Sequence, residues 1–429
     1  MPPTKTRPVA AAGVPVAMDL VLPCGLRLVV AQDRSLAVAA IVLAIDAGTR
    51  DDPSGYPGLV QTLAYHLLAG NRELRPGATL GAVHDHGGWA GMAIGAAQVR
   101  YESLVPLSQL ERVLWAESQR LQAPNVNANL WLKSINYAKR DQGRKPALAR
   151  EIWAGVWQDE GLVHEGRRIG AQRGQKLASM VDLQISGHLS RLFRYDRSTL
   201  VVVAPQTPAE LVAKIRPLFA DLPAVKRLLR GRPGLPVTQQ TREMELPGAK
   251  GHTFVWTVSA APGAAAWAKV WCDALNRQKR RRGDAKGIRL RCVVGVDPRR
   301  GVLIVRASGP GDPAVIVGER IVRLTSGRDR KLLERRRKRR SRRLSRKLSM
   351  PLEMATHLAQ VEPVWDPVLD GVGAEEGSVA QHRGEVTLSA LTGEMLLQSL
   401  ETSLKLAPEL LDLRSAVRLI APANAKKSP

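Results

Sequence analysis

The chain contains 429 residues, of which 44% are hydrophobic and 24% are charged, and this composition is that of a globular protein rather than a disordered or fibrous one. This length favours two domains of about 200 residues each. The formal net charge of +25 favours binding to acidic partners. The sequence has no uncharged apolar run of about 18 residues, so no membrane-spanning helix is expected.

The positive charge is concentrated in two runs in the second half of the sequence. Residues 277–291 carry eight Lys or Arg against one Asp, a net +7. Residues 328–347 carry thirteen Lys or Arg against one Asp and one Glu, a net +11. Together the two runs supply +18 of the +25, so the rest of the chain is only mildly basic.

The first 17 residues are expected to form a flexible leader. Lys5 and Arg7 precede an apolar stretch, residues 9–18, which loosely imitates a secretory signal. That stretch is short and is interrupted by Gly13 and Pro15. The sequence therefore favours a cytoplasmic location slightly and leaves export open.

Three cysteines, Cys24, Cys272 and Cys292, lie far apart and lack Cys-x-x-Cys spacing. This arrangement is typical neither of a disulfide framework nor of a cysteine zinc site. We predict three buried thiols.

Hydrophobic patterns predict alternating strands and helices along the first half of the chain. The expected strands span residues 20–30, 37–45, 89–94, 98–101 and 198–205. The expected helices span residues 58–70, 78–86, 107–122, 126–142, 147–157, 181–193 and 208–219.

The order of motifs begins again after a segment rich in Gly and Pro, residues 223–238, which reads as a linker. Leu246-Pro247 echoes Leu22-Pro23, and residues 415–422 echo residues 198–205 at a similar offset. The sequence therefore predicts a duplicated α+β unit, with domains at residues 18–222 and 239–424 and a tail at residues 425–429.

The helix at residues 58–70 is the centre of the first half. Leu59, Leu63 and Leu67 recur at four-residue intervals, and a glycine ends the run. Gln61 and Tyr65 consequently share one helix face, with Ala64 beside them.

The residues around this helix resemble the pitrilysin/insulinase metallopeptidases, peptidase family M16. Residues 46–55 resemble the loop before the family's zinc helix, residues 87–101 resemble its Gly-Gly strand pair, and residues 110–121 resemble its Leu-Glu helix. The resemblance implies two homologous LuxS/processing-peptidase-like metallohydrolase-fold domains, each an antiparallel sheet flanked by helices, closing as a clamshell.

The family's zinc motif, His-x-x-Glu-His, is absent from this helix. Gln61 and Tyr65 stand where active members have zinc-binding imidazoles, and Ala64 stands where they have the glutamate that takes a proton from water. A further zinc-binding glutamate is expected near residues 136–138, but Asp141 is the only acid between Glu117 and Glu151. The resemblance therefore implies that all four positions are lost and that no zinc is bound.

Two other family motifs are also altered. Gly91, Ile94 and Ala97 replace the Asn, Thr and Asp of the substrate-aligning strand. Residues 286–290 resemble the second-domain motif of helper subunits, which supplies an Arg and a Tyr to align substrate. Leu290 stands at the Tyr position and Gly283 at the Arg position, so this chain does not match the standard helper either.

The leading hypothesis is a catalytically inactive M16 homologue that acts as a structural, regulatory or peptide-holding subunit. Its expected partner is an active, zinc-bearing M16 subunit or a second copy of itself. An extended peptide is expected to add to a sheet edge. The candidate peptide-binding residues are Gln61, Tyr65, Trp89, Gly91 and Tyr101.

Two alternatives stay open. One is a zinc endopeptidase with unconventional ligands, for which His66, His84 and His86 are the nearest candidates. The other is polyanion binding through the basic run at residues 328–347, although that run contains no aromatic residue for base stacking. A solvated helix face, an acidic-partner surface, nucleic acid and an anionic membrane would each account for this run. Its central cations are Arg335, Arg336, Arg337, Lys338, Arg339 and Arg340.

Overall fold

The computed structural model describes most of the first half of the chain and the main elements of the second. The described residues are 17–35, 37–53, 55–95, 98–122, 124–144, 171–225, 243–245, 252–258, 264–277, 289–297, 300–308, 313–325, 329–348, 350–360 and 417–420. Four predictions lie wholly or mainly outside these ranges: the leader, the helix at residues 147–157, the linker and the tail.

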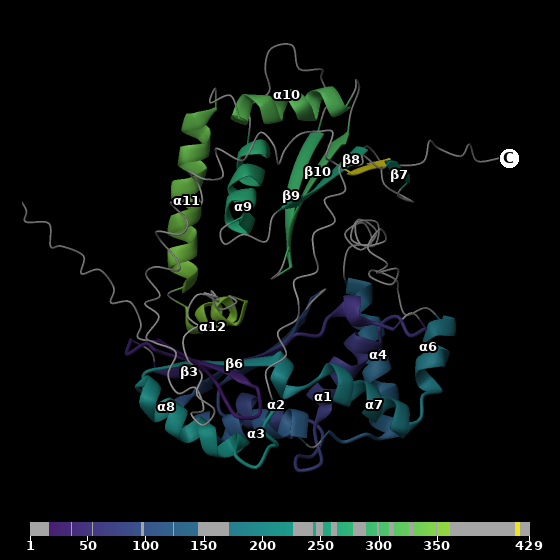
Figure 1. The fold of residues 1–429 in the computed structure, drawn as a ribbon, viewed down its shortest axis with the longest axis vertical. Helices are drawn as coiled ribbons and strands as arrows, with labels where there is room; N and C mark the ends of the chain where they lie inside the picture. The colour runs from purple at the N-terminus through teal and green to yellow at the C-terminus, as the bar shows by residue number, and fades with distance from the viewer. Residues whose placement is uncertain are drawn as a thin grey trace, which may run out of the picture.

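A six-stranded sheet forms the centre of the first half, in the order β1-β2-β6-β3-β5-β4 (Figure 1). The β2–β6 pair is parallel and every other pair in this sheet is antiparallel, so the sheet is mixed rather than wholly antiparallel. Its strands are β1 (Ala17–Val21), β2 (Arg27–Gln32), β3 (Val38–Ile45), β4 (Trp89–Ile94), β5 (Val99–Pro106) and β6 (Ser198–Ala204).

The strand predicted at residues 20–30 is wrong in one respect, because it is divided into β1 and β2. Leu22 donates its N–H to the carbonyl of Leu26 across a tight turn. Gly25 occupies the left-handed region at φ 82°, where a side chain would be strained. β1 and β2 therefore fold back on each other as an antiparallel pair.

A second sheet repeats this topology. Its order is β7-β11-β8-β10-β9, and its β7–β11 pair is parallel, as β2–β6 is in the first sheet. The echo between residues 198–205 and 415–422 thus corresponds to two equivalent central strands. The strands are β7 (Glu243–Glu245), β8 (His252–Val258), β9 (Arg289–Asp297), β10 (Arg300–Ser308) and β11 (Val417–Ile420).

The helices of the first half pack on one face of the first sheet, and their apolar side chains form one continuous core with the strands. Six predicted helices are confirmed, with ends shifted by up to four residues: α1 (Leu59–Ala69), α2 (Ala78–His84), α3 (Leu110–Gln122), α4 (Ala128–Arg144), α7 (Asp182–Leu192) and α8 (Pro208–Ile215). A further helix, α6 (Ala171–Ala178), has no counterpart among the predictions.

The central helix α1 begins at a point fixed by an acid from the preceding loop. The carboxylate of Asp52 accepts the N–H groups of Gly58 at 2.5 Å and Val60 at 2.7 Å. These N–H groups have no partner inside a helix, so the acid caps the first turn from outside. Burial raises the pKa of Asp52 to about 7, against the opposing effect of the two N–H donors.

The second half contributes four described helices: α9 (Ala264–Leu275), α10 (Pro313–Thr325), α11 (Arg330–Leu348) and α12 (Pro351–Gln360). α9 and α10 cover one face of the second sheet, and α11 packs on α9 through Leu333. Leu333 belongs to the core that α9 shares with the second sheet.

α12 does not pack on the second sheet but on the first (Figure 1). Met354, Ala355 and Leu358 form a cluster with residues of β2, β3 and β6, including Val42 and Val201. These strand residues point away from the core formed by α1–α8, because successive side chains alternate between the faces of a sheet. The first sheet is therefore covered on both faces.

The cysteine prediction is right for Cys24 and wrong for the other two. Cys24 is a buried free thiol, and burial raises its pKa. Cys272 on α9 and Cys292 on β9 form a disulfide, because the packing of this helix on this strand brings their Cα atoms to 5.1 Å. Among the described helices, none is both long and apolar enough to cross a bilayer.

Candidate functional site

The polar face of α1 is held against α4 by a direct hydrogen bond. Gln61 donates from Nε2 to Oδ2 of Asp141 at 2.7 Å, and the Gln61 side chain is only 1% exposed. The two helices run side by side in the first half (Figure 1). A carboxylate therefore lies beside Gln61 on the polar face of α1.

The resemblance places the distant zinc-binding glutamate near residues 136–138. Asp141 reaches Gln61 from about one helical turn further along α4. The loss of the zinc-binding residues stays a prediction.

One turn further along α1, the ring of Tyr65 stacks on the ring of Tyr137 from α4. The ring centroids are 6.0 Å apart and the planes differ by 27°. Tyr65 is half-buried and Tyr137 is 50% exposed, so this end of the α1–α4 contact reaches the surface. The stacked pair closes the helix face on which the zinc ligands of active relatives would stand.

Ala64 is fully buried and offers no polar side-chain atom. Its backbone carbonyl accepts the hydroxyl of Tyr101 at 2.9 Å, and this contact ties α1 to β5. Burial raises the pKa of Tyr101, which keeps the phenol protonated. Tyr101 thus holds α1 in place on the sheet.

A buried ion pair, which the sequence pattern does not predict, lies next to this contact. Arg120 donates from Nη2 to Oε1 of Glu117 at 2.7 Å and from Nη1 to the carbonyl of Leu67 at 2.8 Å. Its guanidinium also lies 4.3 Å from the centroid of the Tyr101 ring. The pair links α3 to α1 and β5, and its charged groups are directed at one another.

His66 points away from the Gln61–Tyr65 face, as its position on the helix predicts. It is 1% exposed, and its ring lies edge-on to Trp131 with centroids 5.7 Å apart. Neither ring nitrogen has a hydrogen-bond partner in the part of the chain that the structure describes. Burial lowers the pKa of His66, so the neutral ring is the form that fits.

The residues around Gln61 do not fit a zinc ion. Zinc in proteins takes imidazole, thiolate and carboxylate ligands, and a catalytic site needs three of them. Here Asp141 is the one such side chain, because Gln61 presents an amide and Tyr65 a phenol. Among the described residues, no three His, Cys, Asp or Glu side chains are grouped as a metal site would need. No step through a metal-bound water is derived from this donor set.

The strand β4 forms one edge of the described first sheet, since β5 is its described neighbour. Ala90 and Met92 pack against the core, which places Trp89 and Gly91 on the opposite face. The Trp89 ring lies directly over Gly91, where an added Cβ would stand 2.6 Å from it. Trp89 is 46% exposed.

The backbone of β4 alternates between β5 and its outer edge. Gly95 donates its N–H to the carbonyl of Gln98, which closes the β4–β5 hairpin with a hydrogen-bonded pair. In an antiparallel ladder such pairs alternate with pairs whose N–H and C=O point outward. Ala90, Met92 and Ile94 therefore present their backbone groups at the outer edge.

The peptide-binding candidates are thus not equally accessible. Trp89 and Gly91 lie at the open strand, Tyr65 is half-buried, and Gln61 and Tyr101 are buried in contacts between elements. Of the altered second-domain motif, Leu290 is the second residue of β9 and is partly buried, whereas residues 282, 283 and 286–288 lie outside the described ranges.

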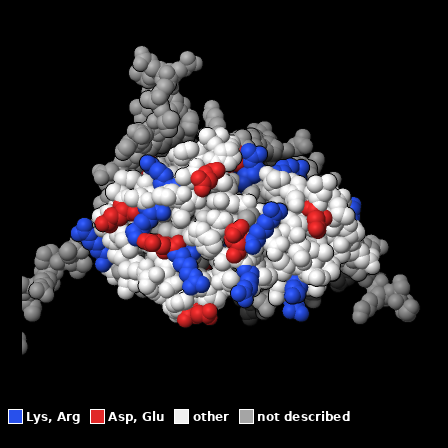
Figure 2. Space-filling model, turned by 90° about the horizontal axis from the view of Figure 1, so that it is seen from below, with Lys and Arg blue, Asp and Glu red and all other residues white. Residues whose placement is uncertain are grey.

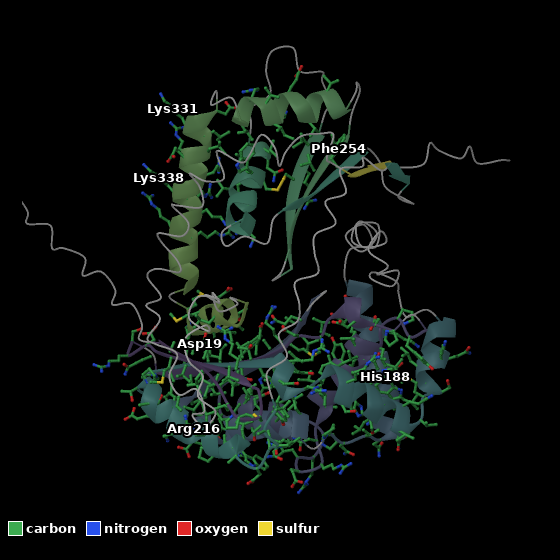
Figure 3. The ribbon with its side chains drawn as sticks, in the orientation of Figure 1. Asp19, His188, Arg216, Phe254, Lys331 and Lys338 are labelled. Atoms are coloured by element: carbon green, nitrogen blue, oxygen red, sulfur yellow. A yellow bond between two sulfur atoms is a disulfide. The ribbon has the colours of Figure 1, made fainter. Side chains whose placement is uncertain are left out.

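The cations of the basic run lie on different sides of α11. Arg335, Lys338 and Arg339 are exposed and line one hollow, and Lys338 points away from the body of the second half (Figure 3). Arg340 lies 3.8 Å from Asp273 of α9, and Arg336 is half-buried. For Arg337 only the helical backbone is described.

Searches with family models and among curated proteins find no match for this chain. Solved structures do match. The first half of the periplasmic protease PqqL from Escherichia coli superposes with a TM-score of 0.66 at 14% identity, over 95% of this chain and 92% of that one. A protease from Helicobacter pylori superposes with a TM-score of 0.68 at 13% identity, over 94% of this chain and 99% of that one.

Pitrilysin itself superposes over the full length of this chain, with a TM-score of 0.62 and 13% identity. The chain spans 47% of pitrilysin, so pitrilysin is about twice as long. Identities this low establish the fold and leave the activity open. The resemblance seen in the motifs is therefore confirmed for the architecture: this chain has the fold of the pitrilysin-type peptidases, peptidase family M16.

Proposed function

We propose that this chain is a catalytically inactive member of the M16 fold that holds an extended peptide and acts as a structural or regulatory subunit. It works beside a separate, zinc-bearing M16 chain or a second copy of itself. The peptide adds to the outer edge of β4, and the α1–α4 contact keeps that edge in place.

The observation that carries the proposal is the direct contact between Gln61 and Asp141. This hydrogen bond occupies the carboxylate that would otherwise be available to a metal. Ala64 has no group that accepts a proton, so general-base activation of water at this position has no residue to perform it. The scaffold of the site is present, and its side chains join two helices instead of binding an ion.

The peptide-holding role is supported by the form of β4. Three outward backbone positions at Ala90, Met92 and Ile94 offer donors and acceptors to a further strand. Trp89 provides an exposed ring beside them, and rings of this kind are frequent in binding surfaces. In this proposal Gln61 and Tyr101 do not contact the peptide. Gln61 holds α1 against α4, and Tyr101 holds α1 against β5.

The pairing role rests on the lengths of the structural relatives. Pitrilysin is about twice as long as the segment that this chain matches. We infer that a second chain of the same fold supplies the equivalent of the remaining part, and that its zinc site performs the cleavage.

Metal analysis and a cleavage assay test the inactive state. The purified full chain, dialysed without chelator, should contain far less than one zinc per molecule and should not cleave fluorescein-labelled casein. One zinc per chain together with chelator-sensitive cleavage would show that the chain is a peptidase and would overturn the proposal.

A restored site tests whether the scaffold is preserved. The triple variant Gln61→His, Ala64→Glu, Tyr65→His should bind about one zinc, because two imidazoles and Asp141 then form a three-ligand set. The matched control Gln61→Leu, Ala64→Glu, Tyr65→Phe has no imidazole and should bind none. Absence of zinc from the folded restored variant would mean that Asp141 is not placed to complete the site.

Binding at the strand edge is tested at Met92. Replacing Met92 with Pro removes an outward N–H, which an edge strand tolerates, and should abolish binding of unfolded casein. Met92→Ala keeps the N–H and should bind casein as the unchanged chain does. Equal binding by both variants would place the peptide elsewhere.

A further inference from the structure

The outward side of α11 carries a cluster of exposed cations that do not pack in the core. Five side chains of the described residues line one hollow of about 720 Å³: Arg335, Lys338, Arg339, Arg342 and Arg343. All five are exposed, and their spacing of three and four residues places them on one helix face. No acidic side chain is among the described residues that line the hollow.

This row is separate from the part of α11 that stabilises the fold. Leu333 is buried in the core with residues of α9, and Leu332 is packed beside it. Arg340 turns toward Asp273 on α9, and its charge is thereby partly offset. Lys331 and Lys338 point the other way, out from the molecule (Figure 3).

Like charges at this spacing work against the helix. Pairs such as Arg335–Arg339 and Arg339–Arg343 are one turn apart, and each like-charged pair costs about 0.2–0.5 kcal/mol. The first half has a different surface: on the face seen in Figure 2, Lys and Arg are interspersed with Asp and Glu. A row of cations that weakens its own helix is explained by a ligand that neutralises it.

We propose that this face of α11 binds the phosphate backbone of a nucleic acid duplex without sequence preference. Residues 335–343 rise by about 12 Å along the helix and present five cations, one per roughly 2.4 Å. A duplex carries one negative charge per about 1.7 Å of its axis.

The side chains themselves favour phosphate. Four of the five lining residues are Arg, whose planar guanidinium donates two parallel hydrogen bonds to phosphate oxygens. No aromatic residue is among them, so base stacking does not contribute and a single strand gains little. A lipid surface is disfavoured because membrane-lying helices bury their apolar face in lipid, and Leu333 is already buried against α9.

Fluorescence anisotropy with a labelled 20-base-pair DNA duplex of arbitrary sequence tests this site on the full chain. Binding at about 0.1 M salt should have a Kd in the micromolar range that is typical of sequence-independent contacts. The variant Arg335→Gln, Arg339→Gln, Arg343→Gln removes one row of the face. It should weaken binding by more than about tenfold and reduce the slope of log K against log salt by roughly 2 to 3.

A control variant removes three exposed arginines from the first half: Arg72→Gln, Arg75→Gln, Arg112→Gln. It loses the same net charge and should bind the duplex within about twofold of the unchanged chain. Circular dichroism and the thermal midpoint establish that both variants are folded. An equal loss in the two variants would mean that total charge, and not this face, governs binding.

Two further measurements keep the proposal falsifiable if the α11 variant fails to fold. On the unchanged chain, adding the duplex should slow hydrogen exchange in residues 330–348, and absence of such protection would overturn the assignment. Polyglutamate or vesicles of phosphatidylglycerol, matched to the duplex in total charge, should compete much less well than unlabelled duplex. Equal competition by either would replace the nucleic acid with an acidic protein or a lipid surface.

Discussion

The two halves of the molecule share one strand order but place their charges in opposite ways. The first half contains two buried or half-buried ion pairs, Arg120 with Glu117 and Arg27 with Asp19, whose nearest atoms are 2.7 Å and 2.6 Å apart. In the second half, α11 presents a row of exposed cations to solvent. The charges of the first half therefore hold elements together, whereas those of α11 are available to a ligand.

This contrast predicts how strongly each charge should affect folding, and the largest effect belongs to Arg120. Replacing Arg120 with Ala leaves Glu117 buried without its partner, which should cost about 3–5 kcal/mol of unfolding free energy. Urea unfolding followed by circular dichroism measures the loss. Arg112→Ala, at an exposed position of the same helix, is the control, and comparable losses in the two would break the contrast.

The second-largest change in unfolding free energy is expected at α12, the helix of the second half that packs on the first sheet. Leu358→Ala should cost about 2–3 kcal/mol, because it removes buried methyl groups from the contact with β2, β3 and β6. Hydrogen exchange should quicken in those strands of the first sheet, although the substitution lies in the second half. Met350→Ala, at an exposed position, should change neither quantity.

His66 gives an effect that depends on pH. Burial lowers the pKa of His66. The contribution of His66 to the unfolding free energy is therefore fully present above the unfolded pKa of about 6.5 and is lost as the pH falls below it. His66→Leu removes this dependence, so its unfolding free energy relative to that of the unchanged chain should rise as the pH falls from 7 to 5. Identical pH profiles in urea unfolding would show that His66 is not buried in its neutral form.

The smallest effect is expected at Arg340, in the second half. Its distance of 3.8 Å from Asp273 and the partial exposure of both side chains make this a weak ion pair, worth less than about 0.5 kcal/mol. Thermal unfolding of Arg340→Gln should coincide with that of the unchanged chain within about 2 °C. A loss of stability close to that of Arg120→Ala would mean that the ion pairs of the two halves stabilise the fold to a similar extent.

The sequence predicts those parts of the fold that local patterns specify. The leucine repeat gives α1 and its polar face, and the echo of one strand gives the duplicated topology. The turn at Gly25 is missed because the prediction of one strand includes Pro23 and Gly25, although both are turn residues. The Cys272–Cys292 bond is missed because the contact of α9 with β9 depends on tertiary packing and not on spacing.

The site shows the same limit. That Gln61, Ala64 and Tyr65 share one region of α1 follows from helical periodicity. That Asp141 meets Gln61 does not, because the relative phase of α1 and α4 is set by how the two helices pack. Likewise an apolar face on α12 is visible in its sequence, but the sheet that it covers is not.

The crossing of α12 has a consequence for how the protein is made. The strands β2, β3 and β6 are complete once Ala204 has left the ribosome, yet the residues that cover their outer face, such as Leu358, follow about 150 residues later. At roughly 5–20 residues per second this interval lasts on the order of ten to thirty seconds. During that time a valine-rich surface is exposed on the nascent chain, so we expect a chaperone or a low protein concentration to limit aggregation until α12 is made.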